Sequence, residues 1–334
     1  MKKILFSCLL FSFSCFAYST TLINGAGATF PYPLYSKWFA EYQKTHSQVH
    51  INYQSIGSGG GIRQFLEKTV DFGATDLPMT DEQLKKSSTT VLHIPTTIGA
   101  VVLSYLLPSM HEPLKLTPQT LASIFLGKIT KWNDPALVAL NPGLKNLSQD
   151  ILVVHRADGS GTTGVFTDYL SKVSSEWKSK AGSGTAIHWP TGLGGKGNEG
   201  VMGLIKQTPG SIGYVELIYA KMNKHPYAWL QNKSGQIVEP TLQSVAAAVD
   251  ISSIPADFRV SLTDSPQKSA YPLSSFTYLL VNQTMDKTRG EPLLPFLRWS
   301  INEGQSFAEA LSYTKLPKEL IQKITAKINE IRIK

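Results

Sequence analysis

Three glycine-rich segments constrain the fold of this chain most, because each follows a predicted strand and precedes a predicted helix. They are residues 24–31, 56–61 and 156–162. Glycine lets the backbone turn its amides toward a ligand, and the helix that follows adds unpaired N–H groups and a positive dipole end. Alternation of strands and helices predicts an α/β fold with mostly parallel sheets, and these turns are of a kind that can hold an oxyanion.

The segment at 156–162 reads Arg-Ala-Asp-Gly-Ser-Gly-Thr and carries the strongest chemistry. Arg156 offers a planar set of donors that matches phosphate oxygens, and Asp158 is placed to orient it. Ser160 and Thr162 add hydroxyl donors. Taken alone, the segment could equally be a turn with a helix N-cap. Three segments of the same design favour convergence on one anion.

A carboxylate, Asp76, follows the strand-like residues 70–75. It would repel a fully deprotonated anion, but it could accept a hydrogen bond from a ligand that still carries a proton. Such a group would admit protonated phosphate and exclude sulfate. The alternative interpretation is a helix cap beside Pro78.

The four segments together resemble one family. The order Gly-Ala-Gly-Ala-Thr-Phe-Pro, Ile-Gly-Ser-Gly-Gly-Gly, Asp-Phe-Gly-Ala-Thr-Asp and Arg-Ala-Asp-Gly-Ser-Gly-Thr is similar to that of the periplasmic phosphate-binding proteins of bacterial phosphate ABC transporters, the PstS family. Further similar segments occupy residues 126–134, 192–200 and 209–216. The resemblance therefore runs through nearly the whole chain after its first residues.

This resemblance implies a two-lobed periplasmic-binding-protein fold of type II, with the ligand in the cleft and each lobe built on a mostly parallel sheet flanked by helices. It implies that hydroxyl, backbone N–H, guanidinium and carboxylate groups hold phosphate at eight positions: Thr29, Phe30, Ser58, Asp76, Arg156, Ser160, Gly161 and Thr162. It also implies that Asp158 holds the side chain of Arg156. Two departures stand nearby, His155 where the family often has a second Arg and Gly59 where some members have Ser.

The resemblance also implies a discontinuous first lobe. We expect lobe 1 to comprise residues 20–97 and 278–334, and lobe 2 to comprise residues 98–277. The apolar run at 94–105 would leave the first lobe, and the run at 271–281 would return to it. Binding would then favour closure, because only the closed form makes both sets of contacts.

Residues 1–19 have the features of a signal peptide: Lys2 and Lys3, an apolar run over 4–16, and a cleavage zone of small residues. Export to the periplasm is therefore expected. Lipidation at Cys15 remains an alternative. Cys8 and Cys15 are the two cysteines of the chain, so the mature protein should have no disulfide. No later run is long enough to span a membrane.

Charge and spacing argue against other functions. The formal net charge falls from +8 to +6 when Lys2 and Lys3 are removed, and the remaining lysines are scattered without a basic run, which disfavours nucleic-acid binding. The histidines form no metal-ligand cluster, and the only pair at i,i+4, His46 and His50, is expected on the surface. Residues 192–197 match a dinucleotide-binding pattern but follow no clear apolar strand, so a loop is expected there and no cofactor.

We therefore expect a monomeric solute-binding protein that captures inorganic phosphate and delivers it to the permease and ATPase subunits of an ABC importer. The alternative is a phosphoryl-transfer enzyme with Ser58 or Ser160 as nucleophile. Such an enzyme would need a base or a metal to activate the hydroxyl, and the sequence around these serines offers neither. The prediction is that the chain is not an enzyme.

Overall fold

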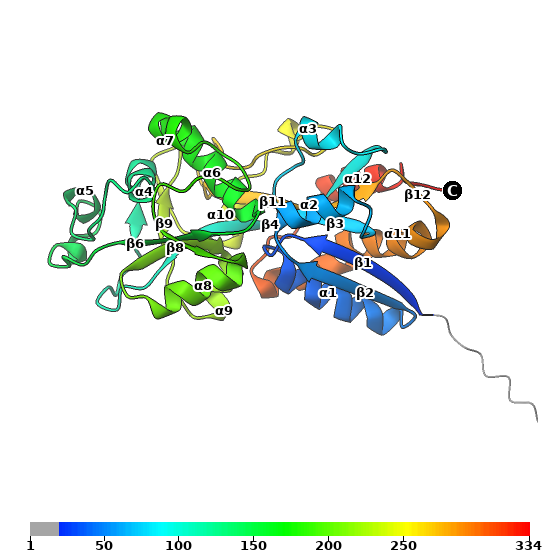
Figure 1. The fold of residues 1–334 in the computed structure, drawn as a ribbon, viewed down its shortest axis with the longest axis horizontal. Coiled ribbons are helices and arrows are strands. Elements are labelled where there is room, and N and C mark those ends of the chain that lie inside the picture. Colours follow the sequence, from blue (N-terminus) through cyan, green and yellow to red (C-terminus); the bar gives the residue numbers. More distant parts are fainter. Residues whose placement is uncertain (1–19) are drawn as a thin grey trace, which may run out of the picture.

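The computed structural model describes residues 20–334, and its main feature is one mixed sheet of eight strands in the order β2-β1-β3-β11-β4-β8-β6-β7. The strands form two groups on either side of β4 and β11, and helices cover the sheet from both faces (Figure 1). The predicted signal peptide and Cys15 lie outside the described residues. Among residues 20–334, no helix is long and apolar enough to cross a membrane.

The first strand group is parallel, because β1 pairs in parallel with both β2 and β3. The chain runs from β1 through α1 to β2, and then through α2 back past β1 to β3. Crossovers between parallel strands are right-handed, and these two run in opposite directions along the sheet, so α1 and α2 lie on opposite faces (Figure 1). Helix α1 buries Leu34, Trp38 and Tyr42, which recur about one turn apart, so the helix predicted after residues 24–31 is confirmed. The elements of this group are β1 (Thr21–Gly27), α1 (Tyr32–Thr45), β2 (Val49–Ser55), α2 (Ser58–Leu66), β3 (Phe72–Thr75) and α3 (Asp81–Leu84).

The second strand group is also parallel, because β6 pairs in parallel with both β7 and β8. Its elements are β6 (Leu152–Arg156), α6 (Gly161–Val173), α7 (Ser175–Lys180), β7 (Leu193–Gly195), α8 (Gly197–Gln207), β8 (Ser211–Glu216) and α9 (Leu217–Met222). The prediction of a loop at residues 192–197 was wrong. This segment is a short strand followed by a helix start, since β7 completes the edge of the sheet beside β6.

Two antiparallel strands join the groups. The first part of β4 (Val91–Tyr105) pairs with β11 (Ser274–Asn282), and its last residues pair with β8. Both contacts are antiparallel, and so is that of β11 with β3. The carboxyl ends of the two parallel groups therefore face each other, with Thr75 of β3 beside β11 and Glu216 of β8 opposite Val101 of β4.

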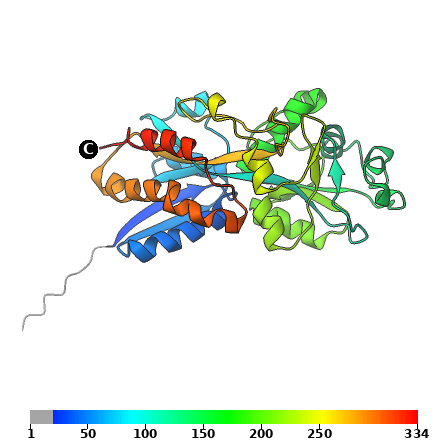
Figure 2. The same cartoon turned by 180° about the vertical axis from the view of Figure 1, so that it is seen from behind.

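The segments that follow β11 return to the first group. Helix α11 lies beside α1, and α12 lies beside α11, although both come last in the chain (Figure 2). The rings of Phe39 on α1 and Phe296 on α11 are 5.6 Å apart. The lobe boundaries at 97/98 and 277/278 stay a prediction, because β4 and β11 run through both positions. This segment contains β12 (Thr284–Met285), α11 (Lys287–Ile301), α12 (Lys318–Ile328) and β13 (Arg332–Ile333), with 3-10 turns at Glu303–Phe307 and Glu309–Leu311.

Smaller elements surround the second group. They are β5 (Lys115–Leu116), β9 (Trp229–Gln231) and β10 (Ile237–Val238), which form a three-stranded sheet, with α4 (Pro118–Phe125), α5 (Pro135–Val138), α10 (Leu242–Ala246) and 3-10 turns at Pro142–Leu144 and Ile251–Ser253.

Candidate functional site

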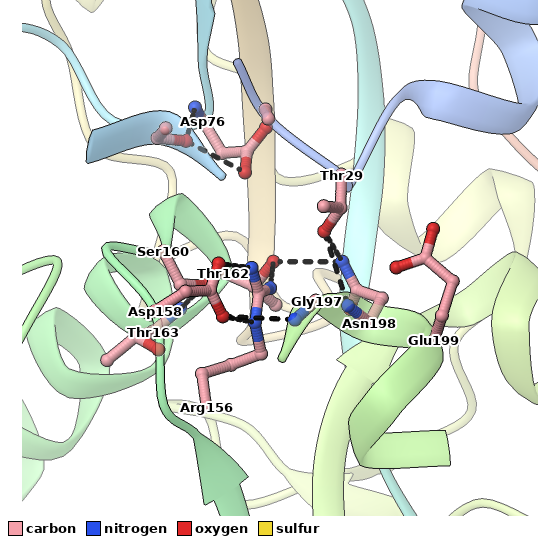
Figure 3. A network of polar contacts seen from close by, with 12 residues as sticks. Thr29, Asp76, Arg156, Asp158, Ser160, Thr162, Thr163, Gly197, Asn198 and Glu199 are labelled. Carbon is pink, nitrogen blue, oxygen red and sulfur yellow. Dashed lines mark hydrogen bonds and ion pairs between the residues drawn. The ribbon is translucent and has the colours of Figure 1, made fainter. Parts of the chain in front are cut away.

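The carboxyl ends of the two strand groups meet at one place, and the eight predicted ligand residues and Asp158 all lie around it. Helices α2, α6 and α8 each begin there. The N–H groups in the first turn of a helix have no acceptor within the helix, and the positive end of the helix dipole adds to their attraction for an anion. Thr29 and Asp76 face Arg156, Ser160 and Thr162 across the site (Figure 3).

Glycines allow the two groups to approach this closely. A Cβ atom at Gly161 would lie 2.3 Å from Oγ of Ser58 and 2.5 Å from Oδ2 of Asp76, so a larger residue would not fit. The N–H of Gly59 donates to the carbonyl oxygen of Gly159 at 2.8 Å. A Cβ at Gly59 would be only 3.0 Å from Cα of Gly159. Glycine at position 59 therefore allows the first turn of α2 to lie close to the segment that precedes α6.

Arg156 ends strand β6 and carries the positive charge of the site. Its side chain is 1% exposed, and its Nε and Nη2 donate to the two carboxylate oxygens of Asp158 at 2.7 and 2.5 Å. Burial alone would raise the pKa of Asp158, but the hydrogen bonds and charge of Arg156, with the N–H of Gly197, hold this pKa below its ordinary value. The carboxylate therefore fixes the guanidinium plane and leaves further N–H donors on Nη1 and Nη2.

The neighbouring His155 does not replace the second arginine of the family. Its ring stacks on Trp189 with centroids 4.7 Å apart. Burial lowers the pKa of His155 below its ordinary value. The imidazole is therefore mainly neutral near pH 7, so it supplies no second full charge.

Asp76 is the one acidic side chain among the predicted ligands, and it is fully buried. The hydroxyl of Thr277 donates to its Oδ1 at 2.9 Å, and the hydroxyl of Ser58 lies 3.4 Å from its Oδ2. Burial raises the pKa of Asp76 to about 7, while Thr277, the charge of Arg156 and Ser58 lower it. The carboxyl group is consequently poised to exchange a proton near neutral pH.

Thr29 and Phe30 are held by residues from distant parts of the chain. The carbonyl oxygen of Thr29 accepts a hydrogen bond from the hydroxyl of Tyr219 at 2.6 Å, and that of Phe30 accepts one from Tyr313 at 2.5 Å. The phenyl ring of Phe30 is completely buried beside Gly99. These contacts fix the backbone that leads from β1 into α1.

The serines of the site have structural hydrogen-bond partners. Oγ of Ser160 accepts the N–H of Thr163 at 3.0 Å as the N-cap of α6. Oγ of Ser58 accepts the N–H of Asp76 at 3.2 Å. Among residues 20–334, neither hydroxyl has a histidine as hydrogen-bond partner, and no group of His, Cys, Asp or Glu is placed to hold a metal ion. His46 and His50 are exposed, as expected.

Sequence reasoning missed three residues that shape the site: Thr277, Asn198 and Tyr219. Asn198 lies in the segment 192–200 that resembled the family, so its position carried a signal, but it was assigned no role there. Thr277 lies on β11, which was expected only as a return strand. Tyr219 on α9 had no signal in the local sequence.

Comparisons with known proteins identify the family and the fold of the chain. A family model described as a PBP superfamily domain matches residues 17–303. The phosphate-binding protein PstS of Xylella fastidiosa (strain 9a5c) is 47% identical over 309 residues, which cover 91% of this chain and 84% of that protein. PstS of Pasteurella multocida (strain Pm70) is 44% identical, covering 97% of this chain and 95% of that protein. The solved structure of a high-affinity periplasmic phosphate-binding protein, PfluDING, bound with phosphate, has a TM-score of 0.73 at 22% identity and covers 91% of this chain and 93% of its own.

The mixed sheet, the flanking helices and the structural similarity define a solute-binding protein of the type II periplasmic-binding-protein fold. The sequence identity goes further, because it extends over nearly the whole chain. The chain belongs to the PstS family of phosphate-binding proteins. The predicted family and fold class are confirmed, and so is the prediction of a binding protein rather than an enzyme, since the matched relatives are named as binding proteins.

Proposed function

We propose that this protein captures inorganic phosphate between the two strand groups and delivers it to an ABC-type phosphate importer. One observation carries the proposal: the N-terminus of α6 and the buried Arg156 lie opposite a buried carboxyl group, Asp76. Donors dominate the site, which suits an oxyanion. A single acceptor among them suits an oxyanion that still carries a proton.

Each predicted ligand residue would have a defined role. Arg156 would form the ion pair and Asp76 would accept the ligand's proton. Hydroxyl groups would donate to the remaining oxygens from Thr29, Ser58, Ser160 and Thr162, and backbone N–H groups would donate from Phe30, Ser58, Gly161 and Thr162. Because the donors come from both strand groups, phosphate would stabilise the form in which the two groups are together.

The same proposal covers location, organisation and partners. Residues 1–19 would direct export to the periplasm, and the two strand groups would act as lobes divided near 97/98 and 277/278. The mature protein would work as a monomer and pass phosphate to the permease and ATPase subunits of the importer. Its family placement supports this role, because the relatives are named PstS.

Titration calorimetry on phosphate-free protein tests the function directly. Phosphate and arsenate should bind in one-to-one complexes, while sulfate and molybdate should bind far more weakly near pH 8. An assay with a chromogenic phosphate ester should show no hydrolysis. Absence of a phosphate isotherm would contradict the proposal, and so would equal affinity for all four anions at this pH.

A further inference from the structure

Asn198, the second residue of α8, joins two of the proposed ligand hydroxyls that come from opposite strand groups. The residue is completely buried. Its Nδ2 donates to Oγ1 of Thr29 at 2.7 Å and to Oγ1 of Thr162 at 3.3 Å. Its backbone N–H also points at Oγ1 of Thr29, at 3.3 Å. In Figure 3 the amide stands between these two side chains.

The orientation of the Asn198 amide is set by its other contact. The backbone N–H of Glu216 donates to Oδ1 of Asn198 at 2.9 Å. A backbone N–H cannot accept a hydrogen bond, so the oxygen of the amide must face Glu216. The NH₂ group must then face the hydroxyls of Thr29 and Thr162.

This orientation decides what the two hydroxyls can do. A hydroxyl oxygen has two acceptor positions and one proton to donate. Oγ1 of Thr29 accepts from both N–H groups of Asn198, and Oγ1 of Thr162 accepts from Nδ2 of Asn198 and from Nη1 of Arg156 at 3.2 Å. Both oxygens therefore have their acceptor positions filled, and each proton is left to donate elsewhere.

We infer that Asn198 is a positioning residue that makes Thr29 and Thr162 obligatory hydrogen-bond donors toward the anion. A hydroxyl that is free to rotate accepts as readily as it donates, so it does not by itself favour an oxyanion. With their acceptor positions occupied, these two hydroxyls favour ligands that present only acceptor oxygens toward them. The inference rests on the proposed function. It adds that Asn198, which is not one of the proposed phosphate ligands, contributes to the selectivity for anions.

A double-mutant cycle measured by phosphate titration tests this inference. Asn198→Ala should weaken phosphate binding about tenfold or more, the loss expected when hydrogen bonds are no longer pre-oriented. If Asn198 acts through the hydroxyls, the same change should have an effect of less than about threefold in protein that already carries Thr29→Val and Thr162→Val. The inference would be overturned if Asn198→Ala weakened phosphate binding by the same factor in wild type and in the protein that carries Thr29→Val and Thr162→Val.

Asn198→Asp provides a second variant if the alanine protein does not fold. It keeps the size of the side chain and the acceptor for Glu216 N–H, but its carboxylate would accept the protons of Thr29 and Thr162. Phosphate affinity should fall by about a hundredfold or more, since both donors are lost and a negative charge is added. Affinity within about threefold of wild type would overturn the inference.

Asn141→Ala is the matched control, because Asn141 is a buried asparagine outside the site, and its side chain forms hydrogen bonds with the backbone of Lys115 and Leu137. It should lower the melting temperature and leave phosphate affinity unchanged within about threefold. An equal loss of affinity in this control would overturn the inference, because general destabilisation would then explain both.

If wild type itself gives no phosphate isotherm, the proposed function fails. If wild type binds and Asn198→Ala binds equally well, only the role of Asn198 fails.

Discussion

Asp76 should make the discrimination between phosphate and sulfate depend on pH. Burial raises its pKa to about 7, against the lowering effects of Thr277, Arg156 and Ser58. Above this pH the carboxylate can only accept a hydrogen bond. Phosphate brings a proton of its own, whereas sulfate does not. Sulfate can therefore enter only if Asp76 takes up a proton from solvent.

The size of this effect follows from the pKa. Holding a carboxyl of pKa about 7 protonated near pH 8.5 costs about 2 kcal/mol, at about 1.4 kcal/mol for each pH unit, or roughly thirtyfold in affinity. Wild-type sulfate affinity should therefore fall about tenfold for each unit above pH 7 and level off below about pH 6. Asp76→Asn is neutral throughout, so its sulfate affinity should be independent of pH and exceed that of wild type at high pH. The variant should retain measurable phosphate binding.

Calorimetric titration in two buffers with different ionisation enthalpies measures both the affinity and the protons taken up. Wild type should bind about one proton per sulfate above pH 7, and Asp76→Asn should bind none. Asp150→Asn changes the same charge at an exposed position and should keep the wild-type slope. A wild-type sulfate affinity that is constant between about pH 6 and 8.5 would refute the reasoning, as would a slope that persists in Asp76→Asn.

Three further results are expected. In anion-free protein the pKa of Asp76 is raised, so the folded state binds the proton more tightly than the unfolded state does. The free energy of unfolding should therefore fall by up to about 4 kcal/mol as pH rises from about 4 through 7. Urea unfolding should show this fall for wild type but not for Asp76→Asn. Arg156→Ala should weaken phosphate binding by about 2–5 kcal/mol, because it leaves a buried ligand charge unpaired, and calorimetric affinity within about threefold of wild type would remove Arg156 from the site. Gly161→Ala places a Cβ 2.3 Å from Oγ of Ser58, so solution scattering at saturating phosphate should report a larger radius of gyration than for wild type; an identical profile would contradict closure at this contact.

Local sequence determined much of this protein. The glycine-rich turns, the amphipathic spacing of Leu34, Trp38 and Tyr42, and the apolar run that became β4 depend on residues close together in the chain, where periodicity and turn chemistry act directly. The pairing of Arg156 with Asp158 is also local, since the two residues are only two positions apart in the sequence. Segment chemistry had already pointed to Asp76, Arg156, Ser160 and Thr162 as candidate ligands. The family resemblance then extended the predicted set to eight positions.

The tertiary structure alone decided how these pieces work together. The hydroxyl that supports Asp76 comes from Thr277, 201 residues further along the chain, and the amide that orients Thr29 comes from Asn198, 169 residues further. The pKa of Asp76 depends on complete burial, and Asp76 lies between Ser58 of the first group and Gly161 of the second. The antiparallel centre of the sheet turns the two sets of carboxyl ends toward each other. Sequence patterns report short-range preferences, whereas hydrogen-bond partners, dielectric environment and strand direction at this site are set by contacts between segments that only the folded chain brings together.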